Sequence, residues 1–386
     1  MRIGLDGQPL IKPRTGVGHY TFELARALAT LRPEDSFELI APAAFPASIS
    51  HETETIPNLR MVGVEPNVLM RRWWSIGLSR YLRRARLDLF HGTNYQLPLM
   101  NAKGKVVTVH DLSIFTHPET HDARVARRAR RRLPMFLRAA SHIITPTQAI
   151  KDELAARFNL DPVRITVTPE APRRSFFPVN SEDTADVRQR LGIENDFILC
   201  VGTIEPRKNL QTLVRAFERI SHQIDRRLQL VIAGGEGWLT NDFDRLLRES
   251  HFRQRILLTG YLADEELRSL YSSCRVFVYP SLYEGFGLPP LEAMACGAPV
   301  IASRIRAHEE TLKDNARLIE PTDDSALAGA ILDLLQDEKV RESLVNAGLA
   351  HVAHFSWRKT AEMTWEVYEA VFADGSHSQL VSARGD

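Results

Sequence analysis

Short apolar runs rich in β-branched residues alternate with longer stretches of helical periodicity along almost the whole chain. Apolar runs closed by Gly, Pro, Asn or Asp predict strands, and apolar residues recurring every three or four positions predict helices. The predicted strands are Arg2–Leu5, Phe37–Ile40, Leu59–Val64, Leu87–Phe90, Lys105–Val109, His142–Thr145, Arg164–Thr168, Phe197–Val201, Leu228–Ala233, Arg255–Leu258, Arg275–Tyr279, Pro299–Ala302 and Arg317–Ile319. Strand-helix alternation predicts an α/β fold whose parallel sheets carry helices on both faces.

The alternation breaks near Pro178–Thr184, where turn residues replace the periodic pattern. We therefore predict two doubly wound domains, residues 1–180 and 181–372, followed by a loose polar tail over residues 373–386. Ligands of such sheets bind at the carboxyl ends of the strands, so polar and glycine residues at these ends are candidates for a site. They are Gly16, Gly18, His91, His110, Asp111, Glu170, residues 202–208, residues 234–237 and the loop around Glu284.

Composition narrows the class of protein. With 386 residues, 44% of them hydrophobic, the chain can bury more than one core. Cys200, Cys274 and Cys296 lie in apolar segments without the spacing of a metal site, which favours buried reduced thiols. The chain opens on a strand pattern, and no uncharged run approaches the roughly 18 residues of a spanning helix. We expect a cytoplasmic protein, neither exported nor transmembrane.

The charge is distributed unevenly, although the formal net charge is only +1. Residues 1–180 hold 26 basic and 16 acidic residues, a net charge of +10, and residues 181–386 hold 23 and 32, a net charge of −9. Two segments concentrate the basic charge, Arg71–Arg86 with Trp73 and Trp74, and Arg124–Arg138 with seven arginines. Both read as amphipathic helices that would suit the inner, anionic face of a cell membrane. A nucleic acid or a merely solvated face are the competing interpretations.

The segment Tyr283–Glu292 carries the most specific chemistry. It sets two carboxylates, Glu284 and Glu292, on either side of a glycine-rich turn that opens a helix. Glycines allow backbone N–H groups to approach an anion at the positive end of the helix, and the two carboxylates could each accept hydrogen bonds from a pair of hydroxyls. The pattern fits an elongated nucleotide sugar. An ordinary strand-helix turn with one solvated and one capping Glu is the competing interpretation.

The run E-G-F-G-L-P-P-L-E-A-M-A-C-G-A-P-V-I-A-S from Glu284 to Ser303 resembles the two-glutamate motif of the family 4 retaining glycosyltransferases. Similarity extends to Gly4–Leu28, Asp88–Pro118, Ile198–Phe217 and Phe355–Trp357, so it spans nearly the whole chain. The resemblance implies the GT-B fold, two Rossmann-like domains facing a central cleft. It also implies that the last helix, about residues 357–372, returns to the first domain.

Arg207 and Lys208 follow a strand and open a helix, where positive charge is unfavourable unless an anion binds. Lys208 matches the phosphate-binding lysine of the family. Many relatives carry an arginine where this chain has Thr203, which leaves open whether Arg207 supplies the second positive charge.

The resemblance extends the predicted donor site to both halves of the chain. It implies that Gly16 and Gly18 contact phosphate or acceptor, that His110 is an active-site histidine, and that the backbone near Tyr261 and Leu262 meets the nucleobase. The predicted catalytic residues are His110, Glu284 and Lys208; the predicted donor-binding residues are Gly16, Gly18, Arg207, Lys208, Tyr261, Leu262, Glu284, Gly285, Phe286, Gly287, Leu288 and Glu292. From the residues alone, a histidine at a strand end such as His110 is more often structural, and only the resemblance favours an active-site role. Glu170 is either a ligand contact or a cap at the interdomain hinge.

No Asp-x-Asp pattern ends a strand, and Asp323-Asp324 follows Pro321 in a predicted loop. We therefore expect no metal site and no cofactor. Arg207, Lys208 and the helix N-terminus would then have the role that Mg²⁺ has in other enzymes. The resulting hypothesis is a retaining hexosyltransferase. The runs G-V-G-x-Y, V-H-D-L and E-P-R-K-N-L resemble those of bacterial mannosyltransferases of surface-polysaccharide assembly, and this resemblance favours GDP-mannose as donor and a saccharide or lipid-linked saccharide as acceptor. UDP-glucose, UDP-GlcNAc and dTDP-rhamnose stay open as donors. A nucleotide-sugar epimerase and a non-enzymatic membrane or nucleic-acid adaptor are the alternatives from other classes.

Overall fold

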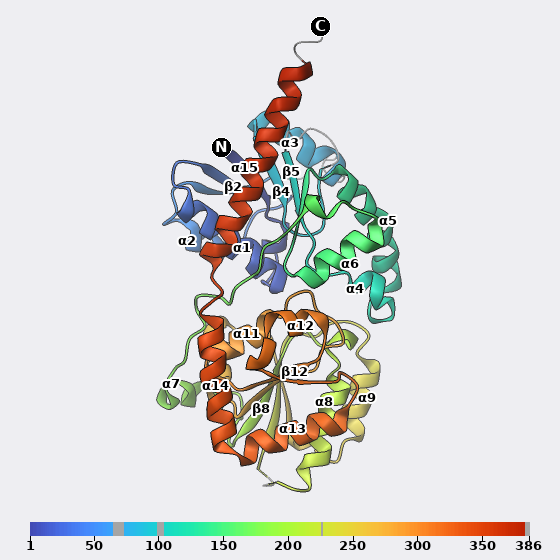
Figure 1. Cartoon of the computed structure of the whole chain (residues 1–386). Coiled ribbons are helices and arrows are strands. Elements are labelled where there is room, and N and C mark those ends of the chain that lie inside the picture. The colour runs from blue at the N-terminus through green and yellow to red at the C-terminus, as the bar shows by residue number, and fades with distance from the viewer. Residues whose placement is uncertain (65–72, 99–103, 225–226, 383–386) are drawn as a thin grey trace. The chain divides into compact units, whose positions relative to one another are not determined.

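The computed structural model describes residues 1–64, 73–98, 104–224 and 227–382 (Figure 1). Contacts group the chain into two compact units. The first unit consists of Met1–Leu112, Arg127–Glu170 and Ser356–Asp386, and the second of Ser113–Ala126 and Ala171–Phe355. The sequence had placed the boundary after residue 180, whereas residues 171–180 make their contacts with the second unit.

The sheet of the first unit has seven strands in the order β3-β2-β1-β4-β5-β6-β7. Its strands are β1 Arg2–Asp6, β2 Ser36–Ala41, β3 Leu59–Gly63, β4 Leu89–Gly92, β5 Gly104–Thr108, β6 His142–Thr145 and β7 Ile165–Val167. Its helices include α1 Gly16–Leu31, α2 Ala47–Thr53, α3 Leu78–Ala85, α6 Gln148–Phe158 and α15 Trp357–Ser382, and α5 Ala123–Ala139 extends into it. All pairings between these strands are parallel, and the order reverses between β1 and β4, as in a doubly wound sheet.

The sheet of the second unit has six strands in the order β10-β9-β8-β11-β12-β13, again with parallel pairings. Its strands are β8 Phe197–Val201, β9 Gln229–Ala233, β10 Ile256–Gly260, β11 Val276–Tyr279, β12 Val300–Ser303 and β13 Arg317–Ile319. Its helices include α4 Ser113–Thr116, α7 Ser181–Arg190, α8 Leu210–Ser221, α9 Asn241–Glu249, α10 Asp264–Ser273, α11 Leu288–Ala295, α12 Arg306–Thr311, α13 Asp324–Gln336 and α14 Glu338–Val352. The strand order reverses between β8 and β11, so a ligand site is expected at the carboxyl ends of these two strands.

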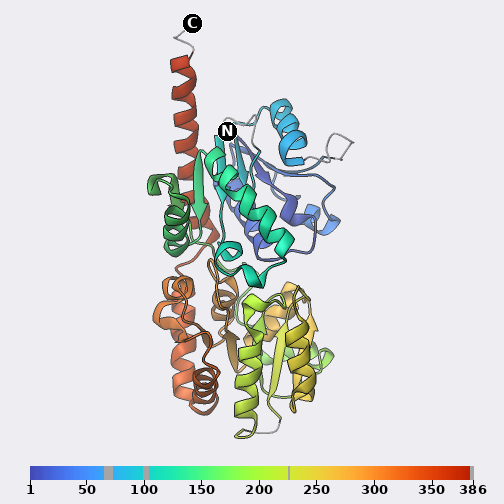
Figure 2. The ribbon, with the colours of Figure 1, turned by 90° about the vertical axis from the view of Figure 1, so that its right-hand side faces the viewer.

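Every predicted strand is confirmed, with ends that shift by no more than two residues. The reason is visible in β8, whose successive side chains enter two different cores. Phe197, Leu199 and Val201 pack with α10 and α11 on one face, and Ile198 and Cys200 pack with α8, α9 and α13 on the other. A strand buried on both faces must be apolar throughout, which makes it recognisable from sequence. Figures 1 and 2 show helices on both faces of each sheet.

Helix α1 begins earlier than the sequence suggested. The glycine pattern after β1 suggests a loop over residues 15–20 and a helix only from Phe22, but Gly16 is the first residue of α1 and His19 N–H donates to Thr15 O at 2.9 Å. Gly18 lies in the first turn, and a Cβ built on it would stand 3.1 Å from Pro9 O. Close packing against Pro9 therefore accounts for a glycine at position 18.

Helix α15 is part of the first unit and is longer than predicted, since it continues to Ser382 through most of the expected tail. Thr360 Oγ1 donates to Pro169 O at 2.6 Å, and Tyr368 OH lies 2.6 Å from His91 Nδ1. The ring of Trp365 lies against Phe37 of β2. These contacts anchor the helix to the sheet, and Trp357 at its start lies edge-on to Tyr20 of α1.

The basic segments are only partly as expected. Arg71 and Arg72 lie outside the described residues; a π-helical turn, Trp73–Gly77, leads into α3. Trp73 is 7% exposed, so the expectation of a surface tryptophan there is wrong; its size favours packing inside the unit. In α5 the side chains of Ala126, Leu133, Phe136 and Leu137 are buried, whereas Val125, Met135 and the arginines between Arg124 and Arg138 are exposed. None of the described helices has the length and apolar character needed to cross a membrane.

Candidate active site

Two charged loops meet where the strand order of the second sheet reverses. Lys208 ends the short 3₁₀ turn after β8, and Glu284 lies in the loop between β11 and α11. Lys208 Nζ is 2.7 Å from Glu284 Oε1, and Arg207 Nη1 is 2.8 Å from Glu284 Oε2. The hydroxyl of Tyr279, the last residue of β11, donates to Glu284 Oε1 at 3.0 Å and accepts from Lys208 Nζ at 2.6 Å. We call Arg207, Lys208, Tyr279 and Glu284 the ionic cluster.

The ionic cluster is largely shielded from solvent. The side chains of Lys208, Arg207 and Glu284 are 11%, 13% and 10% exposed. Burial by itself would raise the pKa of the Glu284 carboxyl, but the adjacent Arg207 and Lys208 outweigh burial and hold this pKa well below its usual range. Arg207 is also paired with the buried carboxylate of Glu205. The cluster therefore presents fixed ionised groups at the expected ligand position.

Asn209 fixes the two loops against each other. Its backbone adopts a left-handed conformation, with φ of +53°, which turns the chain from Lys208 into α8. Its side-chain amide donates to Pro280 O at 3.0 Å and to Pro321 O at 2.7 Å. The N–H of Leu282 donates to Arg207 O at 2.9 Å. The positions of Lys208 and Glu284 thus depend on a shared backbone framework.

Glycines allow the backbone near the cluster to pack closely. A Cβ built on Gly234 would lie 2.0 Å from Gly202 O, so the glycines after β8 and β9 serve this contact between the two strand ends. Gly287 precedes α11 with φ of +95°, a conformation that disfavours other residues. Pro289 and Pro290 occupy the first turn of α11, where their missing N–H groups are not needed.

The remaining predicted donor residues differ in accessibility. Phe286 is 5% exposed and belongs to the core, with its ring 6.0 Å from that of Phe355, so only its backbone can face a ligand. Gly285 is buried beside it, and Leu288 begins α11. Leu262 packs against the core, whereas the Tyr261 side chain is 57% exposed. The backbone contacts that the sequence predicted for these residues stay a prediction.

Glu292, the second glutamate of the motif, lies in α11 as predicted and is 3% exposed. Arg173 holds both of its carboxylate oxygens, through Nε to Oε1 at 2.7 Å and Nη2 to Oε2 at 2.9 Å. Arg173 Nη1 also donates to Asp264 Oδ1 at 2.6 Å. Arg173 is not predictable from the sequence, because one arginine among the turn residues that follow Glu170 carries no distinguishing local pattern.

His110 lies in the first unit, directly after β5. Its Nε2 donates to Thr93 O at 2.8 Å, and its Nδ1 is 3.0 Å from Glu170 Oε1. Burial by itself would lower the pKa of His110, but Glu170 outweighs burial and the pKa is raised. Glu170, which the sequence left unassigned, is thus the partner of His110. Both ring nitrogens have protein partners here, so the predicted substrate contact of His110 stays a prediction.

His91 occupies a different environment from His110. It is buried between Thr108 Oγ1, 2.7 Å from its Nε2, and Tyr368 OH at its Nδ1, and burial lowers its pKa to about 3. A neutral, enclosed imidazole of this kind joins the sheet to α15. The structural interpretation of His91 is therefore favoured.

The Asp323-Asp324 pair lies where the predicted loop passes into a helix, since α13 begins at Asp324. Asp323 caps α13 by accepting from Ala326 N–H at 2.8 Å, and Asp324 pairs with Arg219. Within the described ranges, no group of three or more His, Cys, Asp or Glu side chains has the arrangement of a metal site.

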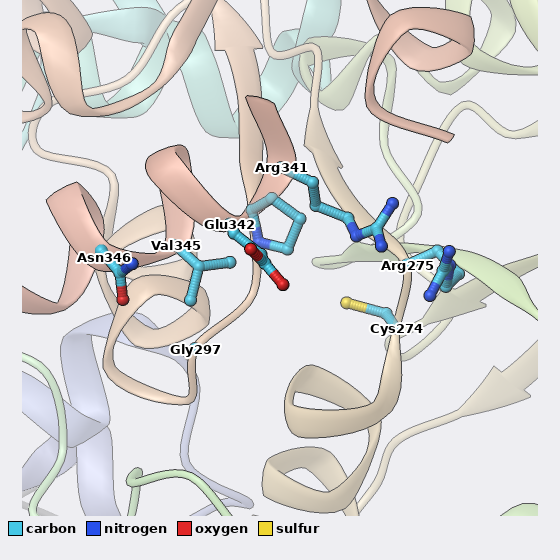
Figure 3. A pocket seen from close by; sticks show the side chains of 8 residues that line it. Cys274, Arg275, Gly297, Arg341, Glu342, Val345 and Asn346 are labelled. Atoms are coloured by element: carbon cyan, nitrogen blue, oxygen red, sulfur yellow. The ribbon is translucent and has the colours of Figure 1, made fainter. Parts of the chain in front are cut away.

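A cavity of about 350 Å³ lies elsewhere in the second unit (Figure 3). Cys274, Arg275, Gly297, Pro299 and residues of α14 line it. Arg275 and Pro299 immediately precede β11 and β12, so this cavity is at the amino ends of the strands. It lies at the opposite sheet edge from the ionic cluster and is not the predicted donor site.

Comparison with known proteins agrees with this arrangement. Residues 14–171 match the family described as Glycosyltransferase Family 4, and residues 183–351 match the family described as Glycosyl transferases group 1. O-antigen chain mannosyltransferase B of Escherichia coli is 32% identical over 380 residues, which cover 96% of this chain and the whole of that protein. O-antigen chain mannosyltransferase RfbU of Salmonella typhimurium is 26% identical over 331 residues, 84% of this chain and 88% of that protein.

Solved structures share the fold at lower sequence identity. Sucrose-phosphate synthase of Thermosynechococcus elongatus has a TM-score of 0.76 at 22% identity, covering 97% of this chain and 99% of that one. HepE of Anabaena in complex with UDP-glucose has a TM-score of 0.73 at 19% identity, covering 96% of this chain and all of that one. These likenesses establish the GT-B fold of two Rossmann-like domains. Together with the matches along both halves of the sequence, they lead to one conclusion: the chain belongs to the family 4, group 1 glycosyltransferases.

Proposed function

We propose that this glycosyltransferase moves mannose from GDP-mannose to a hydroxyl of a saccharide or lipid-linked saccharide, with retention of configuration and hence an α-glycosidic bond. The observation that carries the proposal is the ionic cluster at the reversal point of the second sheet, where cations and an ionised carboxylate stand together. The choice of mannose is supported by the relatives from Escherichia coli and Salmonella, which are named as O-antigen chain mannosyltransferases.

Lys208 and Arg207 supply positive charge for the diphosphate of the donor. When the bond between the sugar C1 and the diphosphate oxygen breaks, negative charge grows on the leaving diphosphate, and fixed cations in a shielded site stabilise that charge. The two cations stand in for a metal ion, so the reaction requires no cofactor. Arg207 provides the second positive charge that Thr203 does not.

Glu284 remains ionised and accepts hydrogen bonds from hydroxyls of the transferred sugar. Its carboxylate is already paired with two cations, which makes it a poor nucleophile for a covalent intermediate. Retention then follows from attack on the same face of the sugar. The acceptor oxygen bonds to C1 as the diphosphate leaves, and the hydroxyl proton moves to the leaving diphosphate oxygen.

Glu292 accepts hydrogen bonds from the ribose diol of the nucleotide, and His110 donates from its imidazole to the sugar or the growing charge. The contact between His110 and Thr93 O is the one that a substrate oxygen would replace. The geometry at His110 supports its role as a hydrogen-bond donor, because Thr93 O can only accept a hydrogen bond and Glu170 favours the protonated ring.

Peripheral binding to an anionic membrane surface is part of the same proposal. The exposed arginines of α5 support an electrostatic attraction, and Val125 and Met135 of the same helix are exposed beside them. A lipid-linked acceptor would be concentrated at such a surface.

The test is calorimetric titration of the protein with GDP, UDP, dTDP and ADP, followed by product analysis with the matching sugar donor, with and without acceptor. We expect GDP to bind most tightly, mannose transfer to persist in EDTA, and the product to have α configuration by NMR. If the protein preferred UDP or dTDP, the transferred sugar would be glucose, GlcNAc or rhamnose instead of mannose. Conversion of the sugar donor without an acceptor would indicate an epimerase. Absence of nucleotide binding would favour a non-enzymatic adaptor.

A further inference from the structure

Helix α12 contacts the turn that leads into α11. The hydroxyl of Thr311, the last residue of α12, donates to Phe286 O at 3.1 Å. At the next residue of the turn, a Cβ built on Gly287 would stand 3.1 Å from both Cδ2 and Nε2 of His308. Thr311 is 3% exposed and His308 is fully buried. Two side chains on one turn of α12 therefore support two successive residues of the glycine turn.

Both supporting residues are held in place by hydrogen bonds of their own. The backbone oxygen of Thr311 accepts from Nε2 of His351 in α14 at 2.8 Å. His308 Nδ1 donates to Ser303 O, at the end of β12, at 2.9 Å, and burial lowers the pKa of His308. Its Nε2 has no hydrogen-bond partner within the part of the chain that the structure describes. The contact between His308 and Gly287 is therefore one of packing.

The bond from Thr311 sets the direction of the peptide group between Phe286 and Gly287. In a trans peptide the C=O and the N–H point in opposite directions. Because the carbonyl of Phe286 points toward Thr311, the N–H of Gly287 points away from α12. Gly287 has φ of +95°, and glycine adopts positive and negative φ about equally, so this peptide could turn over at little cost. The hydroxyl of Thr311 favours one of the two orientations that the glycine permits.

In the observed orientation, the N–H of Gly287 has no acceptor among the residues that the structure describes, although Gly287 is buried. Buried N–H groups almost always have a partner, so this N–H is suited to a group that arrives with a ligand. It lies directly before α11, at the end of the helix where the dipole favours an anion. Glu284 of the ionic cluster lies in the same turn.

We propose that Thr311 is a positioning residue for the donor diphosphate: its hydroxyl holds the peptide between Phe286 and Gly287 so that the N–H of Gly287 donates to a phosphate oxygen. This inference rests on the proposed function, in which the diphosphate binds beside Lys208. Because Thr311 controls a contact to phosphate, its loss affects the diphosphate and not the nucleoside. Serine can replace Thr311, since it carries the same hydroxyl, whereas valine has nearly the same shape but no donor.

The test is calorimetric titration with inorganic pyrophosphate, GDP and guanosine. Thr311→Val should lower the affinity for pyrophosphate and for GDP about fivefold to tenfold, because a hydrogen bond to a charged group is weakened, and should leave the affinity for guanosine unchanged. Thr311→Ser should retain the native affinities. The matched control is Ser273→Ala, which also removes a bond from a hydroxyl to a backbone carbonyl, that of Ser273 to Ser269 O at 2.7 Å, before β11 begins. It should leave all three affinities unchanged.

The amide signal of Gly287, observed by NMR in protein labelled at glycine nitrogen, gives a second measurement. Pyrophosphate should shift this signal in the native protein, and this arm remains decisive if Thr311→Val does not fold. Native pyrophosphate affinity in Thr311→Val, equal losses for guanosine and pyrophosphate, or a Thr311→Ser variant as weak as Thr311→Val would overturn the positioning role. An amide signal of Gly287 that pyrophosphate does not move would also overturn it. If the native protein binds neither pyrophosphate nor GDP, the proposed function itself fails.

Discussion

Replacing Glu284 by Gln tests the ionic cluster most directly. The substitution keeps the shape of the side chain but removes the charge that faces Lys208 at 2.7 Å and Arg207 at 2.8 Å. All three side chains are about nine-tenths buried, so Lys208 would lose its carboxylate partner and Arg207 would keep only Glu205, and neither cation would gain water. Removing one partner of a buried pair costs about 3–5 kcal/mol, and a retained neutral hydrogen bond places the expected loss near the lower end, about 3 kcal/mol.

The assay is thermal and urea unfolding of the protein, monitored with a spectroscopic probe that lies in the second unit. In a unit of this size, a loss of about 3 kcal/mol in the free energy of unfolding lowers Tm by roughly 10 °C. Inorganic pyrophosphate should raise the Tm of the variant more than that of the native protein, because it replaces the missing negative charge beside Lys208 and Arg207. The control is Asp242→Asn, which breaks an exposed pair with Arg245 and should leave Tm nearly unchanged.

The pH dependence gives a second check on the same substitution. The pKa of Glu284 is lowered by folding, so its contribution is fully present above the unfolded pKa of about 4.5 and is lost as pH falls toward the folded pKa. The difference in unfolding free energy between native and variant should be constant from pH 7 to about 5 and should shrink in more acidic solution. A Tm within 2 °C of the native value at pH 7 would refute the interpretation of the cluster as a buried, mutually dependent set.

Glu170→Gln should lower the pKa of His110, measured by NMR titration of its ring, and an unchanged titration would contradict the pairing. Because folding raises this pKa, the stabilisation of the native protein by His110 is present below pH 6.5 and is lost as pH rises through the pKa of the folded state. Lys208→Ala should weaken GDP binding and turnover together, because the charge that Lys208 meets grows in the transition state; normal turnover would exclude a phosphate role. Gln should replace four exposed arginines of α5, Arg127, Arg128, Arg131 and Arg132. The substitutions should abolish salt-sensitive co-sedimentation with anionic vesicles, while transfer to a short soluble acceptor persists. Co-sedimentation unchanged by the substitutions would show that these arginines form only a solvated face.

The sequence by itself determined the elements of both sheets and the positions of the charged loops. Strands such as β8 are apolar at every position because they are buried on both faces, and this pattern is local. Lys208 and Glu284 were also found from local context, as charged residues beside the glycines and prolines that link a strand to a helix. The family resemblance then related these loops to each other.

Only the tertiary structure decided which groups contact each other. Glu292 is paired with Arg173, 119 positions away, and His110 with Glu170, 60 positions away. Hydrophobic periodicity specifies which face of an element is buried, but it does not specify which polar side chain arrives at a given carboxylate or imidazole. The same limit explains Trp73, whose neighbouring arginines suggested a membrane surface although its ring packs inside the first unit. Burial and pairing depend on residues that are distant in the chain, so they become visible only when the sheets are assembled.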